Sequence, residues 1–405
     1  IDLYGGEYYI DTTRKNVKAA NNSAAANPQW AYQKLGVGDA VYRDFDGHVV
    51  QEGAFFQTEY SKRGLSAFVS GSLSNTSYWR YDRLFYDKEH AKSDTKSYLG
   101  FTVKGGANYN LNEQHNVFFN AGYISRAPKF NYGAVLSPMA SNVTNPDAKN
   151  EKVVSLEVGY GYRLNWLTVN VNGYWTKWLD KTMTKSSTLG TSQTEAFVNM
   201  TGVNALHKGV ELEVKANPFY WLDLNGMFSI GDWKWDSNAT GYVYDNNGQP
   251  LTKDGAIASG IGAKDHLTTG INLKGVRVGG SAQTTAALGA TVKIGKEIRL
   301  GADWTFYGRN YAYYSLSGSN LSLGKTNTVV DPWKIPSASQ VDVNASYKFK
   351  IAGLNSTISA NVNNLFDYQY LGKAWNPQSG AVNENTIYGF YTFGRTFSTR
   401  LKINF

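Results

Sequence analysis

Cysteine is absent from the 405 residues, and proline (9) and methionine (4) are scarce. The lack of cysteine excludes disulfide frameworks, thiol nucleophiles and cysteine-ligated zinc. No uninterrupted run of about 18 apolar residues occurs, which excludes helical membrane spans. The net charge of +8 comes from single, scattered basic residues without a basic block, so nucleic acid is not an expected partner.

Aromatic residues and glycine are abundant instead. The chain has 28 Tyr, 19 Phe, 11 Trp and 41 Gly, and 14% of its residues are aromatic. Tyrosine, tryptophan and threonine favour strands, whereas few residues that favour helices, such as Leu, Glu and Met, are present. The composition therefore predicts an all-β protein and not an α/β enzyme.

Apolar and polar residues alternate along most of the chain. In the last segment, Tyr391, Phe393, Phe397 and Leu401 share one face, and Ser398, Arg400 and Lys402 share the other. Strict alternation indicates strands with one apolar and one polar face. It predicts thirteen strands, at residues 52–62, 65–80, 96–110, 115–126, 152–163, 166–179, 200–216, 220–234, 280–294, 297–313, 338–350, 354–366 and 389–405.

The links between these segments alternate in length. Short links of a few residues, as at 62–64 and 350–354, alternate with long links of about 15 to 45 residues. Short periplasmic turns and long extracellular loops are typical of outer-membrane β-barrels. A soluble propeller, the main alternative, would show a repeat of about 40 residues, and none is found. We therefore expect a transmembrane antiparallel β-barrel in the bacterial outer membrane.

The odd strand number bears on domain organisation. Bacterial single-chain barrels have an even number of strands. If the last strand descends to the periplasm, the segment 52–62 descends too, and residues 1–51 form an extracellular loop region. Residues 52–405 then supply the C-terminal strands of a larger barrel. A miscount of one strand would instead give a closed barrel of 12 or 14 strands.

Several motifs resemble one family, the TonB-dependent outer-membrane receptors. Their order and spacing match that family over about residues 50–405. The motifs are Asn145-Pro146-Asp147 with Glu151-Lys152, His207-Lys208-Gly209-Val210-Glu211-Leu212-Glu213, Asn363-Asn364-Leu365-Phe366-Asp367, and Gly394-Arg395-Thr396-Phe397 with the terminal Phe405. The long loops and the segment Ser125-Arg126-Ala127-Pro128 look most like Bacteroidetes members of the family.

The resemblance implies a barrel of about 22 strands whose lumen holds a plug. It implies partnership with the TonB complex through an N-terminal plug and TonB box that this sequence lacks. The remaining barrel strands would come from the same or a cleaved polypeptide. Lipid or lipopolysaccharide is a further expected partner, and a surface lipoprotein over the loops remains open.

Signals for catalysis or metal binding are weak. The five histidines are spread without ligand spacing, and no GxSxG, P-loop, HExxH or usable GxGxxG motif occurs. We expect no enzyme activity, no catalytic residue, no metal and no cofactor. A Ser–His pair brought together across strands is left open.

Aromatic residues in the predicted extracellular loops are the candidate ligand-binding residues. Flat rings among Asn, Ser and Asp suit stacking on sugars or on apolar ligand faces. An interfacial girdle and packed loops would use many of the same residues. The candidates are Trp233, Trp235, Tyr313, Tyr314 and Trp375.

Three functions follow as hypotheses. The first is energised import of a scarce ligand, a glycan, peptide, siderophore or cobalamin, with glycans or peptides favoured by the Bacteroidetes resemblance and the aromatic loops. The second is a passive diffusion channel. The third is an outer-membrane enzyme or adhesin.

Overall fold

The computed structural model describes residues 8–9, 34–35, 44–83, 86, 88–136, 142–189, 194–245, 248–314, 316, 321–378 and 380–405. These residues form strands, turns and loops. Within them, no helix is long and apolar enough to cross a membrane. Most of the predicted loop region 1–51 lies outside the described residues, and the first long strand begins at Phe45.

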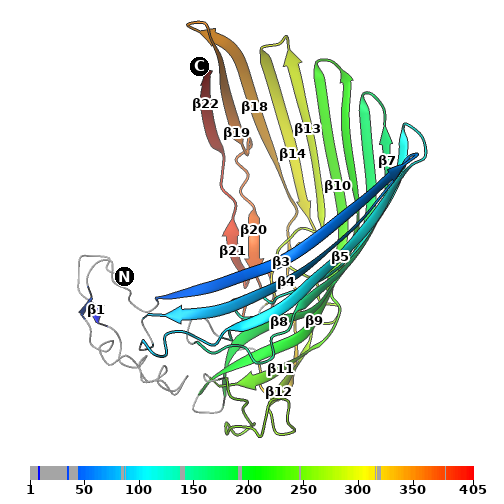
Figure 1. The fold of residues 1–405 in the computed structure, drawn as a ribbon. Helices are drawn as coiled ribbons and strands as arrows, with labels where there is room; N and C mark the ends of the chain where they lie inside the picture. Colours follow the sequence, from blue (N-terminus) through cyan, green and yellow to red (C-terminus); the bar gives the residue numbers. More distant parts are fainter. Residues whose placement is uncertain are drawn as a thin grey trace.

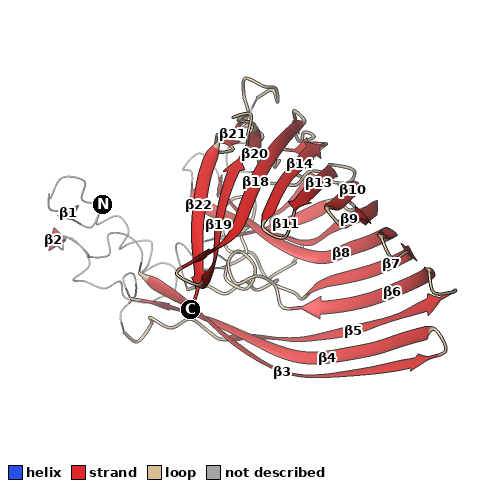
Figure 2. Ribbon diagram, turned by 90° about the horizontal axis from the view of Figure 1, so that it is seen from above, coloured by secondary structure: helices blue, strands red, loops and turns tan. Residues whose placement is uncertain are grey.

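Thirteen antiparallel strands form one continuous curved sheet, which we call the wall (Figure 1). They pair in chain order, and each corresponds to one predicted segment, which confirms the all-β barrel-type fold. Seen from above, the wall is an arch that β3 and β22 bound at its two ends (Figure 2). The wall strands are β3 (Phe45–Lys62), β4 (Leu65–Asp82), β5 (Lys96–Asn110), β6 (His115–Arg126), β7 (Glu151–Arg163), β8 (Leu167–Leu189), β9 (Thr194–Phe219), β10 (Leu222–Trp235), β13 (Thr284–Ile294), β14 (Ile298–Gly308), β18 (Ala338–Ile351), β19 (Leu354–Asn363) and β22 (Thr396–Asn404).

Short turns join the wall strands at one end. The Arg63–Gly64 and Ala352–Gly353 turns have positive φ at both residues, 49° and 83° in the first and 49° and 85° in the second. Two left-handed residues are the signature of a type I′ turn, whose twist matches that of the flanking strands. These turns fix the register of the β3–β4 and β18–β19 hairpins from Lys62 opposite Leu65 and from Ile351 opposite Leu354.

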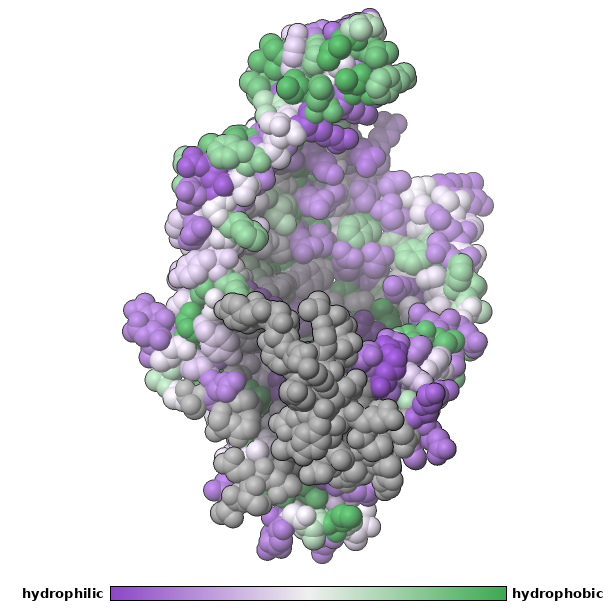
Figure 3. All heavy atoms as spheres, turned by 90° about the vertical axis from the view of Figure 1, so that its left-hand side faces the viewer, coloured by the Kyte–Doolittle hydropathy of each residue, from purple (hydrophilic) through white to green (hydrophobic). Residues whose placement is uncertain are grey.

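The two faces of the wall differ in polarity. On the convex face, large apolar side chains are exposed, such as Leu73 (54%), Val158 (61%) and Leu288 (60%). The concave face carries Ser, Thr, Asn and charged residues, and hydrophilic side chains line much of the hollow (Figure 3). This is the inverse of a soluble protein, and it suits a barrel with lipid outside and a polar lumen.

A compact body that we call the cap sits at the end of the wall opposite the short turns (Figure 1). It comprises the described residues of 180–205, 235–279, 316 and 321–329. The outer arms of β8 and β9 form its base, and β11 (Ala239–Tyr244), β12 (Thr268–Asn272) and β16 (Thr326–Thr328) extend the sheet there. Val198, Val203, Ile271 and Leu273 are at most 1% exposed in its hydrophobic core. Residues 266–278, which lie outside the thirteen predicted strands, contribute β12 to this core.

Strands β8 and β9 are longer than their predicted segments. β8 has 23 residues and β9 has 26, because both continue past the wall into the cap. The pairing register shifts between Trp178 and Met183, and Asp180 has a φ of 55°. A register shift breaks the alternation of faces, which is why the pattern ended at residue 179.

The predicted last strand, 389–405, is two strands. β21 (Tyr388–Tyr391) pairs with β20 (Leu371–Trp375), and β22 starts only at Thr396. Side chains of the link between β19 and β20 hold the interruption: Asn364 donates to the Phe393 carbonyl oxygen at 3.3 Å, and the Arg395 backbone N–H donates to Asp367 at 2.7 Å. The remaining short pairs are β15 (Asn310–Tyr311) with β17 (Lys334–Ile335) and β1 (Tyr8–Tyr9) with β2 (Lys34–Leu35).

Candidate functional site

A cluster of carboxylates and amides lies on the concave face of β6 to β9. Asn172 donates to Glu157 at 3.0 Å and to Glu211 at 3.2 Å, and Asn120 donates to Glu157 at 3.2 Å. The cluster exists because these residues fall on inward positions of adjacent, in-register strands. Neutral amides are thus the donors to two carboxylates in one place, and the arrangement leaves the surface negative.

Aromatic rings adjoin this cluster on the side facing the cap. Trp233 Nε1 donates to the Tyr174 hydroxyl at 2.9 Å, and the His207 ring centroid lies 5.4 Å from that of Trp233. Tyr174 can lie flat on the wall because Gly209 is opposite it, where a Cβ atom would approach the tyrosine oxygen to 2.6 Å. With Glu157 and Glu211, these side chains line a cavity of about 390 Å³, which we call the inner cavity.

The inner cavity suits a cationic or hydrogen-bond-donating group. Two carboxylates and a tyrosine hydroxyl can accept hydrogen bonds, and the rings of Trp233 and Tyr174 offer faces to a cation. In the described part of the chain, no group of three or more His, Asp and Glu side chains is placed to hold a metal ion. Of these residues only Trp233 was a sequence candidate. The sequence could also have identified Glu157, Asn172 and Glu211 as residues that face the lumen, because all three occupy polar positions of alternating strands.

A second aromatic group lies beyond the wall, between β20, β21 and the end of β15. Tyr313 and Trp375 stack at 5.7 Å with an interplanar angle of 27°, and Trp375 and Tyr388 stack at 5.8 Å and 8°. The Lys373 ammonium lies 4.9 Å from the Trp375 ring centroid. We call Tyr313, Trp375 and Tyr388 the aromatic stack. Tyr388 is 50% exposed, so this stack presents a ring face to solvent.

Trp235 and Tyr314 occupy a different environment. Their rings meet edge to face at 5.9 Å within the hydrophobic core of the cap, where Trp235 is only 9% exposed. Burial raises the pKa of the Tyr314 phenol. The five predicted ligand-binding residues therefore lie in three places: Tyr313 with Trp375, Trp235 with Tyr314, and Trp233 alone at the inner cavity.

The Asn145-Pro146-Asp147 motif anchors a loop to the cap. Asn145 and Asn199 exchange two side-chain hydrogen bonds, at 3.0 and 2.8 Å, and both are almost fully buried. Asp147 accepts from Asn199 at 3.0 Å and from the buried Tyr244 hydroxyl. Burial, and then the Asp147 carboxylate, raise the pKa of Tyr244. These hydrogen bonds hold the loop against the cap.

Comparison with known proteins decides the family. The family model described as "TonB dependent receptor-like, beta-barrel" matches residues 1–365. The chain belongs to the TonB-dependent receptor family. Proteins of this family are receptors and transporters of the bacterial outer membrane, and this chain is an outer-membrane β-barrel protein.

Solved structures show the same fold. The chain is similar to the copper transporter OprC, with 17% identity and a TM-score of 0.55 over 88% of this chain and 48% of that one. It is similar to the ferric-catecholate import receptor Fiu from K12 E. coli, with 14% identity and a TM-score of 0.56 over 93% and 49%. It is also similar to the ferric yersiniabactin uptake receptor FyuA from Yersinia pestis, with 15% identity and a TM-score of 0.56 over 92% and 48%.

At these sequence identities, the similarity to the solved structures shows a shared fold. The chain spans about half the length of the receptors it matches. No match was found among curated protein sequences. The resemblance to Bacteroidetes members remains a prediction.

Proposed function

We propose that this chain forms the C-terminal part of the barrel in a receptor that imports a scarce ligand by energy coupling to TonB. In this proposal a plug, contributed by the rest of the receptor, closes the lumen until TonB moves it. The structural neighbours include proteins described as importers of ferric siderophores and copper. No covalent chemistry is required of the chain.

The observation that carries this proposal is the inner cavity. Its two carboxylates face the lumen and receive hydrogen bonds from amides only. A domain inserted in the lumen would place a cationic side chain there, and burial of that pair would strengthen the attraction.

Ligand capture is assigned in this proposal to the aromatic stack. Stacked rings with a neighbouring ammonium group suit sugar rings or aromatic peptide side chains. Lys373 adds a charge that would favour acidic glycans or peptide carboxylates. We therefore propose glycans or peptides as the ligand class, ahead of siderophores and cobalamin.

The test uses the full-length receptor in its own outer membrane. Uptake of a labelled oligosaccharide panel and a labelled peptide mixture is compared in cells with and without TonB. Loss of the aromatic stack in Trp375→Ala should weaken binding about tenfold, as expected when one stacked ring is removed. Trp221→Ala, at a periplasmic turn, is the matched control and should bind as the wild type does.

The outcomes separate the hypotheses. Uptake that needs both TonB and Trp375 supports the whole proposal. Uptake that continues without TonB would identify a passive channel. TonB-dependent uptake that is insensitive to Trp375→Ala would retain energised import and remove the aromatic stack from ligand capture.

A further inference from the structure

A cavity of about 480 Å³ lies where the end of the wall that carries the cap meets the β20–β21 hairpin, and we call it the rim cavity. It is lined by residues from the ranges 280–285, 307–310, 335–338 and 370–372, and by Thr392. None of these residues belongs to the inner cavity, the cap or the aromatic stack. Its volume is usual for a site that holds a small molecule, which is about 300 to 1,000 Å³.

Strand register turns the rim cavity toward the lumen. Thr285 of β13 pairs with Tyr307 of β14, and Tyr307 pairs with Ala338 of β18. Leu288, three residues farther along β13, is 60% exposed on the lipid side. Because side chains alternate between the two faces of a strand, Thr285 and its two partners point into the hollow of the wall.

Two tyrosine rings form one side of the rim cavity. Tyr370, in the link between β19 and β20, stacks on Tyr307 with ring centroids 6.1 Å apart and an interplanar angle of 29°. Tyr307 is 37% exposed, so its ring is accessible from the lumen. The pair combines flat apolar faces with two phenol hydroxyls. This combination suits a sugar ring, which has an apolar face and a rim of hydroxyl groups.

Hydrogen-bonding groups of the rim cavity are incompletely paired. The side-chain oxygen of Asn310 is buried and has no hydrogen-bond donor among the described residues. A buried acceptor without a donor is costly, and a ligand hydroxyl could supply that donor. Thr392 accepts from the Tyr370 backbone N–H at 3.2 Å, so the hydroxyl hydrogen of Thr392 can still be donated to a ligand.

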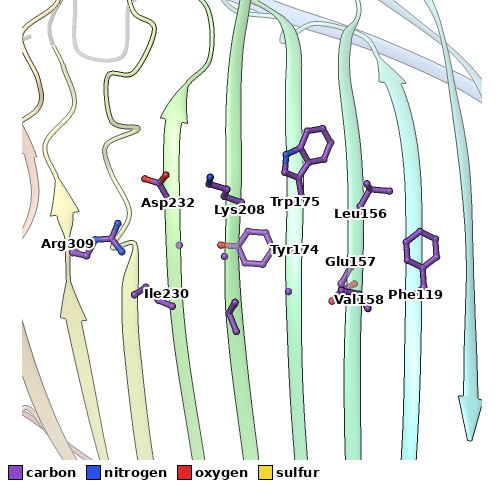
Figure 4. A pocket seen from close by; sticks show the side chains of 14 residues that line it. Phe119, Leu156, Glu157, Val158, Tyr174, Trp175, Lys208, Ile230, Asp232 and Arg309 are labelled. Carbon is purple, nitrogen blue, oxygen red and sulfur yellow. The ribbon is translucent and has the colours of Figure 1, made fainter. Parts of the chain in front are cut away.

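The lining of the rim cavity, within the described part of the chain, has no charged side chain. Arg309, next to Asn310 in the sequence, lies beside Ile230 and Asp232 of β10 (Figure 4). Lys373, on β20, lies over the Trp375 ring of the aromatic stack. A charged ligand group would lose its hydration in the rim cavity without gaining an ionic partner from the lining. The cavity therefore favours a neutral, polyhydroxylated ligand.

The rim cavity adjoins the aromatic stack. Gly280 lines the cavity, and a Cβ atom at this position would overlap the ring of Tyr313, a member of the stack. Strand β20 connects the two sites as well, since Leu371 lines the cavity and Trp375 belongs to the stack. A ligand made of several linked units could therefore occupy both sites at once.

We propose that the rim cavity binds one neutral sugar unit of a glycan whose further units lie on the aromatic stack. Tyr307 and Tyr370 would contact the apolar face of the sugar, and Asn310 and Thr392 would form hydrogen bonds with its hydroxyl groups. This inference rests on the proposed function, and it narrows the ligand class from glycans or peptides to glycans that contain a neutral sugar.

The test measures equilibrium binding by the full-length receptor, purified in mild detergent and without TonB. The probes are neutral disaccharides and hexasaccharides of glucose, galactose and mannose, the corresponding uronic acid disaccharides, and neutral hexapeptides. Isothermal titration calorimetry gives the dissociation constants. The wild type should bind at least one neutral hexasaccharide and the matching disaccharide, and should bind that disaccharide more tightly than its uronic acid form.

Variants assign this binding to the rim cavity. Tyr307→Ala removes one ring and should weaken binding of the hexasaccharide and the disaccharide about tenfold. Ala338→Leu fills the cavity but keeps its hydrogen-bonding groups, and it should weaken both about fivefold. Trp375→Ala should weaken only the hexasaccharide, because the disaccharide occupies the cavity alone. Tyr391→Ala, at a 70% exposed tyrosine outside the lining, is the matched control and should bind as the wild type does.

Three results would overturn the assignment. The first is the absence of binding of every neutral oligosaccharide at millimolar concentration. The second is binding by both Tyr307→Ala and Ala338→Leu within twofold of the wild type, with heat-modifiable mobility showing folded barrels. The third is tighter binding of uronic acid disaccharides or of peptides than of neutral sugars.

These outcomes are distinct from a failure of the proposed function. Binding is measured without TonB, so loss of energised import would leave the dissociation constants and their dependence on Tyr307 unchanged. Conversely, TonB-dependent uptake that needs Trp375 but not Tyr307 would retain the proposed function and remove the rim cavity from ligand binding.

Discussion

The wall and the cap use apolar residues in opposite ways. In the wall, Leu288 points outward and is 60% exposed, whereas Leu273 in the cap is fully buried in a hydrophobic core. The wall is held by its hydrogen-bonded ladder and by the lipid that covers its outer face. The cap carries its own core and does not need the membrane to bury its apolar surface. One chain therefore contains a part stabilised by lipid and a part stabilised as soluble proteins are.

Polar residues show the same contrast. In the cap, Asn145, Asn199 and Tyr244 are buried and satisfy one another or Asp147. On the wall, Glu157 and Glu211 face the lumen and receive only amide donors. The cap network is closed, while the wall cluster is open to a further partner. In the proposed receptor, recognition of an inserted domain would therefore belong to the wall and not to the cap.

The largest effect should come from the core of the cap. Replacing the fully buried Leu273 by Ala removes core contacts and should destabilise the cap by about 2 to 5 kcal/mol. Amide hydrogen exchange in β11 and β12 should accelerate, while heat-modifiable mobility of the barrel is kept. Leu288→Ala on the wall is the matched control, with little change in either measurement. Equal loss of barrel folding in Leu273→Ala would show that the two parts are not independent.

The next effect distinguishes the two faces of the wall. An arginine in place of Leu288, six residues from the short-turn end of β13, would lie near the bilayer midplane and cost about 2 to 4 kcal/mol. Its neighbour Ala287 has an inward position, so Ala287→Arg should cost much less. Urea unfolding in lipid vesicles measures both variants. Similar costs for the two would contradict the assignment of faces.

Alternation alone could predict the wall. Polar and apolar residues alternate along β5, β7 and β19, because each strand meets lipid on one side and a polar lumen on the other. The short turns were predictable for the same reason, since the pattern stops and restarts there. The membrane imposes a strict, local rule, and a local rule can be read from one sequence.

The cap was not predictable in this way. Trp235 and Tyr314, which the sequence placed among ligand-binding aromatics, meet each other in a core built from segments far apart in the chain. Nothing local distinguishes such rings from the exposed Tyr388. The break before β22 was also missed, because it depends on long-range hydrogen bonds: Asn364 donates to the Phe393 carbonyl oxygen, and Asp367 accepts from the Arg395 backbone N–H. Long-range contacts, unlike alternation, leave no periodic signal.

The smallest effect concerns pH and again separates cap from wall. Burial raises the pKa of Tyr244 above its ordinary value of about 10. A group whose folded pKa is raised contributes stability that is complete below the unfolded pKa and is lost as pH rises through the folded pKa. The cap should therefore lose protection from hydrogen exchange above about pH 10, while the wall, held by lipid and backbone pairing, changes less.

Tyr244→Phe should lower cap stability at neutral pH by about 1 to 3 kcal/mol, because Asp147 loses a donor. In the same variant, protection of the cap from hydrogen exchange should fall less steeply above about pH 10. Some dependence on pH should remain, because the pKa of the buried Tyr314 is also raised. Tyr220→Phe, at an exposed position of the short turn between β9 and β10, is the control and should follow the wild type. An unchanged alkaline profile in Tyr244→Phe would place the pH-sensitive group elsewhere and weaken the view of the Tyr244–Asp147 contact as a closing element of the cap.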